Sequence, residues 1–291
     1  MNNKTREKLD ITRQPLRNLG ATLLFAHIPK AAGTTLNRYL EKEYRSWKVF
    51  TFSGYTPRKS RERFVTSSAS RRAGWDVVKG HGSWSVFPYI KNEVSAITIL
   101  RDPVDRCLSA YYYARQNTKH HLHTFAMESS LEEYIISDVT NVLANGQTRA
   151  LSSKIGMYST PIDQDDLIEV QKNIEEHFVV AGISERFEES VALMRLKFGW
   201  TARGISNQNK TKPRKKKEEI SEDVKSLIQA ADHYDCLLYD WVKKRLEREL
   251  EGAGDDLKGH LSALQDHRMV SGKLMTTTRA CVSRAASWLV R

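Results

Sequence analysis

The chain has 291 residues, of which 40% are hydrophobic and 28% are charged, and its 46 lysines and arginines exceed its 35 acidic residues by 11. These proportions exclude a wholly disordered chain and suit one large α/β domain with short extensions. The positive net charge favours an anionic partner, a class that includes nucleotides, nucleic acids, acidic glycans and membrane surfaces.

The cysteines and the N-terminal residues bear on cellular location. Cys107, Cys236 and Cys281 are too few and too widely spaced for a disulfide framework or a zinc site, which fits a reducing compartment. Residues 1–20 carry charges throughout and lack the apolar segment of a secretion signal. No apolar run is long enough to span a bilayer. We therefore expect a cytoplasmic protein without a transmembrane segment. Peripheral membrane contact through the last residues, RAASWLVR, stays open.

Apolar runs rich in β-branched residues predict the strands of a buried sheet. Helical stretches separate these runs, and this alternation predicts an α/β fold in three layers, with a central parallel sheet and helices on both faces. The predicted strands are Ala21–His27, Asp76–Lys79 with its flanking residues, Val94–Leu100 and Phe178–Ile183, with Trp47–Phe52 as a candidate fifth.

Two helical stretches and one loop complete the outline. Asp102 is a good N-cap and Pro103 suits the first helical position, so a helix should begin directly after the strand that ends at Leu100. Ser221–Glu251 predicts one long helical stretch. The polar and basic residues 204–219 before it lack periodicity and predict a loop.

The segment HIPKAAGTT, His27–Thr35, follows the first predicted strand. A loop with Gly33 lets the backbone approach a ligand, and the helix N-terminus after it favours a phosphate, to which Thr34 and Thr35 add hydroxyl donors. Lys30 adds a mobile positive charge. Because Lys30 precedes Gly33, the segment is not a Walker A loop, in which the lysine follows the last glycine. An ordinary strand–helix turn would share these features.

A second segment, ILRDPVDRCLSAYYY, spans the end of a predicted strand and the helix after it. Arg101 stands at the carboxyl edge of the predicted sheet, where open α/β sheets bind ligands. Ser109 lies about two helical turns further, roughly 10 Å from the helix start. The two side chains could hold one phosphate between them if Arg101 folds back along the helix. A solvent-facing arginine and a helix-surface serine fit this spacing equally well.

Together the two segments resemble the phosphate-binding motifs of the sulfotransferases, in the branch that contains heparan sulfate 2-O-sulfotransferase and its bacterial relatives. His27–Leu36 is similar to the family pattern H-I-P-K-T/A-A/G-G-T-S/T-L, and Leu100–Tyr113 is similar to L-R-D-P-V-x-R-x-x-S-x-Y-Y-Y. Further family-like stretches are Leu131–Ile135, Asn145–Arg149, Gly182–Ser190 and Asn209–Arg214. The resemblance covers roughly residues 20–250 and implies a P-loop-type fold, with an N-terminal arm at 1–20, a sulfotransferase domain at 21–251 and a C-terminal extension at 252–291.

The resemblance also implies a sulfuryl donor, 3′-phosphoadenosine 5′-phosphosulfate, used without a metal. The positions that bind the 5′ end of the donor are matched by Lys30, Gly33, Thr34 and Thr35. The positions that bind its 3′-phosphate are matched by Arg101 and Ser109. A segment that folds over the nucleotide in relatives is matched by a basic loop with Lys210, Thr211 and Lys212.

A third segment, KGH at Lys79–His81, ends the strand that precedes that of Arg101. A G-H pair supplies the catalytic base in the branch that the chain resembles, which implies this role for His81. Independently of the resemblance, a hydroxyl must lose its proton as its oxygen attacks sulfur, and a neutral imidazole with a pKa near ~6.5 suits that task. A core or capping histidine would look the same. The next residues, GSWSVFP, depart from the relatives.

The predicted acceptor is a hydroxyl group of a carbohydrate or a glycolipid. A basic mouth formed by Lys79, Arg149 and residues 210–217 would suit an anionic acceptor, and Gln147 is a further candidate contact. We expect no nucleic-acid partner. The cluster of His120, His121 and His123 has no acidic or cysteine partner nearby, so it predicts a loop at the acceptor mouth and not a metal site.

Two other functions fit parts of the pattern. The first is a P-loop-type kinase with Asp102 as the metal-binding aspartate, which the position of Lys30 disfavours. The second is a catalytically silent module that binds polyanions. Such a module would keep Arg101 and the basic loop but would have no need of His81.

Overall fold

A computed structural model describes residues 20–54, 56–137, 144–155, 160–202 and 219–286, with side chains as far as residue 264. The predicted basic loop with Lys210, Thr211 and Lys212 lies outside the described residues, as do nearly all of the N-terminal arm and the final residues 287–291.

A parallel sheet of five strands forms the centre of the fold, in the order β2-β3-β1-β4-β5. The strands are β1 (Thr22–Ala26), β2 (Val49–Phe52), β3 (Val77–Gly80), β4 (Val94–Leu100) and β5 (Phe178–Ile183). Every predicted strand is present, and the candidate fifth is confirmed from Val49 onward. From β1 the chain crosses toward β2, and from β4 it crosses the other way toward β5. The loops after β1 and β4 therefore meet at the carboxyl edge, at the point where such folds form a ligand crevice.

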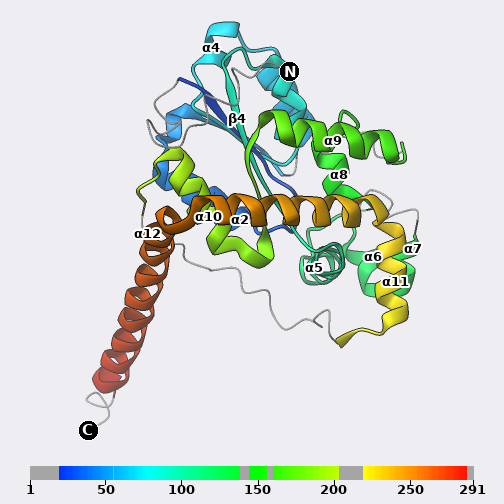
Figure 1. Cartoon of the computed structure of the whole chain (residues 1–291). Helices are drawn as coiled ribbons and strands as arrows, with labels where there is room; N and C mark the ends of the chain where they lie inside the picture. Colours follow the sequence, from blue (N-terminus) through cyan, green and yellow to red (C-terminus); the bar gives the residue numbers. More distant parts are fainter. Residues whose placement is uncertain (1–19, 55, 138–143, 156–159, 203–218, 287–291) are drawn as a thin grey trace.

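Helices pack around this sheet, as the alternation of runs predicts (Figure 1). The α-helices are α2 (Gly33–Glu43), α3 (Pro57–Val65), α4 (Ala69–Ala73), α5 (Pro103–Gln116), α6 (His123–Glu128), α7 (Leu131–Ile136), α8 (Gly146–Leu151), α9 (Gln164–His177), α10 (Phe187–Phe198), α11 (Glu222–Ala231) and α12 (His233–Ala286). Short 3₁₀ helices are η2 (Ser46–Lys48), η3 (Ser83–Tyr89) and η5 (Ser184–Arg186). Figure 1 shows α12 running across the domain, where it packs against α10 and β5.

The helix predicted over Ser221–Glu251 is wrong as a single element. The chain forms α11 and α12 with a break at Asp232, a buried residue whose carboxylate contacts Arg106 and the backbone N–H of Asn145. This contact lies far away in the sequence, so local periodicity could not show it. Helix α12 also continues beyond the predicted end, with non-helical backbone angles at Gly254.

The core explains the apolar runs. Leu24, Val78, Ile97 and Val180 stand on four different strands, and none of them has measurable exposure to solvent. A sheet covered on both faces needs such continuous apolar strands because neither face meets water. Among the helices that the structure describes, none is both long enough and apolar enough to cross a membrane.

Candidate active site

The loop after β1 makes a tight turn into α2. Lys30 and Ala32 both have left-handed backbone angles, with φ of 68° and 58°. Such angles are costly for residues with a side chain and concentrate at functional sites. Helix α2 then begins at Gly33 with no side chain capping it and no acidic residue in its first turn. Its first N–H groups therefore favour an anion.

His27 fixes the identity of residue 33. A Cβ atom on Gly33 would lie 2.0 Å from Cδ2 and Nε2 of the His27 ring, far inside van der Waals contact. The ring cannot move aside easily because it is buried and lies between the rings of Phe25 and His81, at centroid distances of 5.3 Å and 4.1 Å. Close approach of the ring, and not backbone angle, is thus what requires a glycine at the start of α2.

Replacing Gly33 by alanine should therefore displace His27 and everything stacked on it. We expect Gly33→Ala to lower the free energy of unfolding by about 1–3 kcal/mol, the usual cost of overpacking, and to reduce turnover as well. Thermal melts and a transfer assay measure the two effects. Gly252→Ala is the matched control, because no atom lies within 4 Å of its added Cβ. Equal behaviour of the two variants would contradict the packing argument.

His81 follows β3 and has a fixed tautomer. Its Nδ1 lies 3.1 Å from the backbone oxygen of His27. A carbonyl oxygen only accepts hydrogen bonds, so Nδ1 carries the proton and Nε2 keeps its lone pair. Burial lowers the pKa of His81 below its usual value, and the nearby charge of Lys30 lowers it further, against the opposing effect of the bond to His27. The ring is therefore neutral at neutral pH and offers Nε2 as a base.

The His27 ring is neutral for similar reasons. Burial holds its pKa well below the usual range, and electrostatic interaction with His81 and Lys79 acts in the same direction. Its Nδ1 lies 3.1 Å from the side-chain nitrogen of Asn37, which donates to it. His27 thus links the loop after β1 to the candidate base through both its carbonyl group and its ring.

The Lys30 ammonium lies 3.8 Å from the centre of the Tyr113 ring, in a cation–π contact. The His120 ring lies against Tyr113, and His121 stacks on His120, with centroid distances of 5.5 Å and 4.6 Å. Burial, His121 and the Lys30 charge lower the pKa of His120. The structure therefore brings part of the histidine cluster to Lys30. No group of residues suited to a metal ion occurs among those that the structure describes.

Arg101 connects the second segment to the first. Its Nη1 donates to the backbone oxygen of Lys30 at 3.1 Å, and its Nη2 lies 4.0 Å from Asp105. The guanidinium is thus held at the loop after β1, where the sequence predicts a phosphate site. Ser109 lies further along α5 and is almost completely buried. Thr34 is exposed and Thr35 half-buried in the first turn of α2.

Three predicted acceptor contacts are buried and have partners inside the protein. The Lys79 side chain is only 2% exposed, and its ammonium bonds to Glu41 at 2.7 Å. Gln147 bonds to the backbone of Arg101, and Arg149 donates to the backbone oxygen of Thr160 at 2.8 Å. Lys79 and Arg149 therefore add no exposed charge to an acceptor mouth. Strand and helix patterns could not reveal this, because the partners come from distant segments.

Sequence reasoning missed the roles of His27, Tyr113 and Gln147 in this arrangement. Each of them stands inside a segment that the sequence analysis already assigns to the site, so its position in that segment was the only signal that could have pointed to it. What each side chain contacts depends on the folded chain. His27 contacts the base, Tyr113 contacts Lys30 and Gln147 contacts Arg101.

Comparison with known proteins supplies a family. The model of the sulfotransferase family matches residues 20–242, which include all the described site residues. A search of curated proteins found no match to the chain.

Proposed function

The chain belongs to the sulfotransferase family, and we propose that it moves the sulfuryl group of 3′-phosphoadenosine 5′-phosphosulfate to a hydroxyl group of a carbohydrate or glycolipid. The arrangement of His81 beside the loop of Lys30 carries this proposal. It combines a base of fixed tautomer with a cation, Lys30, whose charge acts on the pKa of His81.

The residues at the carboxyl edge fit such a donor. Helix α2 starts at Gly33 without a side-chain cap, and the left-handed angle at Lys30 turns the loop sharply before it. In this proposal Lys30, Gly33, Thr34 and Thr35 hold the 5′ end of the donor, and Arg101 and Ser109 hold its 3′-phosphate. Lys210, Thr211 and Lys212 keep their assignment to the nucleotide on the resemblance alone.

The chemistry follows from what the side chains can do. The bound donor supplies a sulfuryl group on a phosphate leaving group. Nε2 of His81 accepts the proton of the acceptor hydroxyl as its oxygen bonds to sulfur. The imidazolium so formed is stabilised because Nδ1–H already donates to the His27 carbonyl. The Lys30 ammonium offsets the negative charge that grows on the leaving phosphate oxygen as its bond to sulfur breaks.

A carbohydrate acceptor is supported by the resemblance and by the rings beside Lys30. Tyr113, His120 and His121 offer flat faces and polar edges, a combination that suits sugar hydroxyls and sugar ring faces. The acceptor can be identified by offering the protein a sulfur-labelled donor together with a panel of neutral and anionic glycans and glycolipids, and by measuring which of them receives the label.

The two alternative functions find less support. A kinase would need Asp102 as a metal ligand, but this side chain caps α5 by accepting from the N–H of Asp105 at 3.1 Å. A silent polyanion-binding module gives no reason for a histidine held as a single tautomer beside a lysine. Titration with adenosine 3′,5′-bisphosphate and with magnesium–ATP, followed by a transfer assay, separates the three.

Arg101→Ala should weaken binding of adenosine 3′,5′-bisphosphate about tenfold or more, because a hydrogen bond between charged groups contributes about 1.5–3 kcal/mol. Binding of AMP, which lacks the 3′-phosphate, should change little. Isothermal titration of both ligands measures the difference. Equal affinity of the wild-type protein for AMP and the bisphosphate would contradict the assignment of Arg101.

A further inference from the structure

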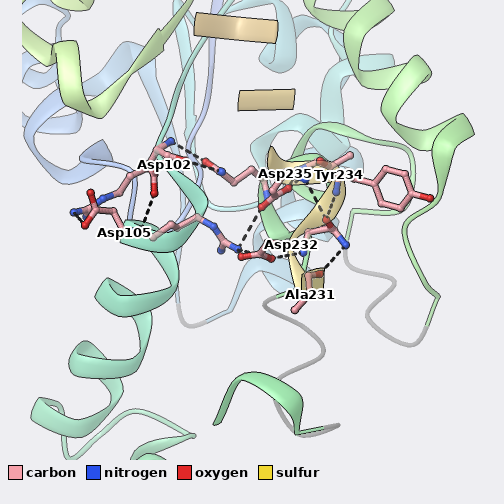
Figure 2. Close-up of polar contacts among 11 residues, drawn as sticks. Asp102, Asp105, Ala231, Asp232, Tyr234 and Asp235 are labelled. Atoms are coloured by element: carbon pink, nitrogen blue, oxygen red, sulfur yellow. Dashed lines mark hydrogen bonds and ion pairs between the residues drawn. The ribbon is translucent and has the colours of Figure 1, made fainter. Parts of the chain in front are cut away.

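A network of buried polar side chains contacts the backbone of Arg101, and neither donor binding nor proton transfer accounts for it (Figure 2). Its nearest member is Gln147 in the first turn of α8, which has no exposure to solvent. The Gln147 Oε1 accepts from the backbone N–H of Arg101 at 2.8 Å, and Nε2 donates to the backbone oxygen of Arg101 at 2.9 Å. The Gln147 carboxamide therefore hydrogen-bonds to both the N–H and the C=O group of Arg101.

Gln147 is itself held in place from α12. The fully buried Asp235 carboxylate accepts from the backbone N–H groups of Gln147 and Thr148, at 3.0 Å and 2.8 Å. The Arg106 guanidinium lies between two carboxylates, 3.3 Å from Asp235 and 3.2 Å from Asp232. Figure 2 shows these aspartates at the start of α12, facing the first turn of α5. Burying such charges is costly, so a network of this kind is weak evidence for stability. Its role is better sought in the positioning of the residues that it contacts.

The backbone of the residue after Arg101 is also held by a side chain. The backbone N–H of Asp102 donates to Glu185 at 3.2 Å, and the Tyr239 hydroxyl of α12 donates to the other oxygen of Glu185 at 3.1 Å. Side chains of Gln147 and Glu185 thus hold the backbone of two successive residues, Arg101 and Asp102, while the Arg101 guanidinium reaches the backbone oxygen of Lys30.

We propose that Gln147 is a positioning residue for the 3′-phosphate. It holds the backbone of Arg101, while Asp235 holds Gln147 and Arg106 holds Asp235, so that the Arg101 guanidinium points at the loop after β1. Helix α12 thereby becomes part of the donor site although it supplies no donor contact. This inference rests on the proposed function, since it takes Arg101 as the residue that meets the 3′-phosphate.

The first test replaces Gln147 by methionine, which has similar length and makes neither hydrogen bond. The measured quantity is the ratio of the Kd for AMP to the Kd for adenosine 3′,5′-bisphosphate. We expect Gln147→Met to reduce this ratio roughly tenfold, with AMP affinity nearly unchanged. Ser152→Ala is the control, since Ser152 is a buried polar residue directly after the other end of α8, and its hydroxyl bonds to the backbone of Arg149 and Lys154.

The second test, Gln147→Glu, separates positioning from packing. A protonated carboxyl group can accept and donate as the amide does, whereas an ionised one cannot donate to the Arg101 carbonyl. Burial beside Asp235 should keep the new carboxyl protonated at acidic pH, against the opposing charges of Arg106 and Arg101. At each pH the ratio of the Kd for AMP to the Kd for the bisphosphate is measured for the variant and for the wild type. The variant's ratio should be close to that of the wild type at pH ~5 and should fall below it as the carboxyl group ionises. A loss of packing would not follow pH in this way.

The outcomes are distinct. A wild-type protein that does not prefer the bisphosphate refutes the proposed function and this inference with it. A wild-type preference that both Gln147 variants retain at every pH overturns the inference alone. In the Arg101→Ala background Gln147→Met should cause no further loss of preference, and an additive loss would contradict the route through Arg101. If a thermal melt shows that Gln147→Met is unfolded, the pH dependence of Gln147→Glu decides, because that variant is compared with itself at different pH values.

Discussion

Replacing His81 should abolish most sulfuryl transfer, with a loss of about 10²–10⁴-fold in turnover, the usual contribution of a general base. His81→Asn is the sharper of two variants, because the asparagine side-chain nitrogen can still donate to the His27 carbonyl while no basic nitrogen remains. His81→Ala removes both functions. We expect both to bind adenosine 3′,5′-bisphosphate as the wild type does, because donor binding uses other residues.

The pH dependence of turnover gives an independent check on His81. Only the neutral ring accepts a proton, and burial and the charge of Lys30 lower the pKa of His81 from its usual 6.5. Activity should therefore persist somewhat below pH 6.5 and be lost as pH falls further through the lowered pKa. The residual activity of His81→Asn should not follow this acid limb.

His260 supplies the control, since it is a half-buried histidine of α12 beyond the residues that the family model matches. His260→Ala should retain most activity. Near wild-type turnover in His81→Asn would contradict the assigned base, as would a thermal melt showing that both His81 variants are unfolded. The base would then have to be an acidic residue at the same edge of the sheet.

Replacing Lys30 should lower turnover by about 10²–10³-fold, by analogy with the removal of one donor from an oxyanion site. The charge that Lys30 meets grows in the transition state, so turnover should suffer more than donor affinity. Lys30→Met keeps the length of the side chain and also keeps a Cβ at the left-handed backbone position, so backbone strain is unchanged.

Steady-state kinetics with varied donor, beside titration of the bisphosphate, separate the two roles of Lys30. Lys91→Ala is the control, an exposed lysine just before β4 and thus at the opposite edge of the sheet. A Lys30→Met enzyme with normal turnover and only a raised KM for the donor would show that Lys30 binds the donor without acting on the reaction.

Local patterns predicted the fold well because the sheet is buried on both faces. Residues such as Leu24 and Ile97 lie in apolar runs that only a covered parallel sheet requires. The same patterns placed Lys30, Gly33 and Arg101 in turns at one edge, and the contact between Arg101 and the Lys30 backbone agrees with that placement.

Patterns failed where a long-range contact decides the outcome. Asp232 interrupts a continuous helical pattern because Arg106 and Asn145 hold its carboxylate. Lys79 looks like a surface charge, but its side chain is buried and its ammonium pairs with Glu41 from α2. Gln147 could be predicted only as part of a family-like stretch, and its two bonds to Arg101 required the structure.

The most direct test of the central claim is a transfer assay with sulfur-labelled 3′-phosphoadenosine 5′-phosphosulfate and the panel of glycans and glycolipids. Wild-type protein should move the label to a hydroxyl of at least one acceptor and release adenosine 3′,5′-bisphosphate in equal amount, and His81→Asn should leave the label on the donor. A label that stays on the donor with every acceptor, although the protein binds the bisphosphate more tightly than AMP, would contradict a carbohydrate sulfotransferase.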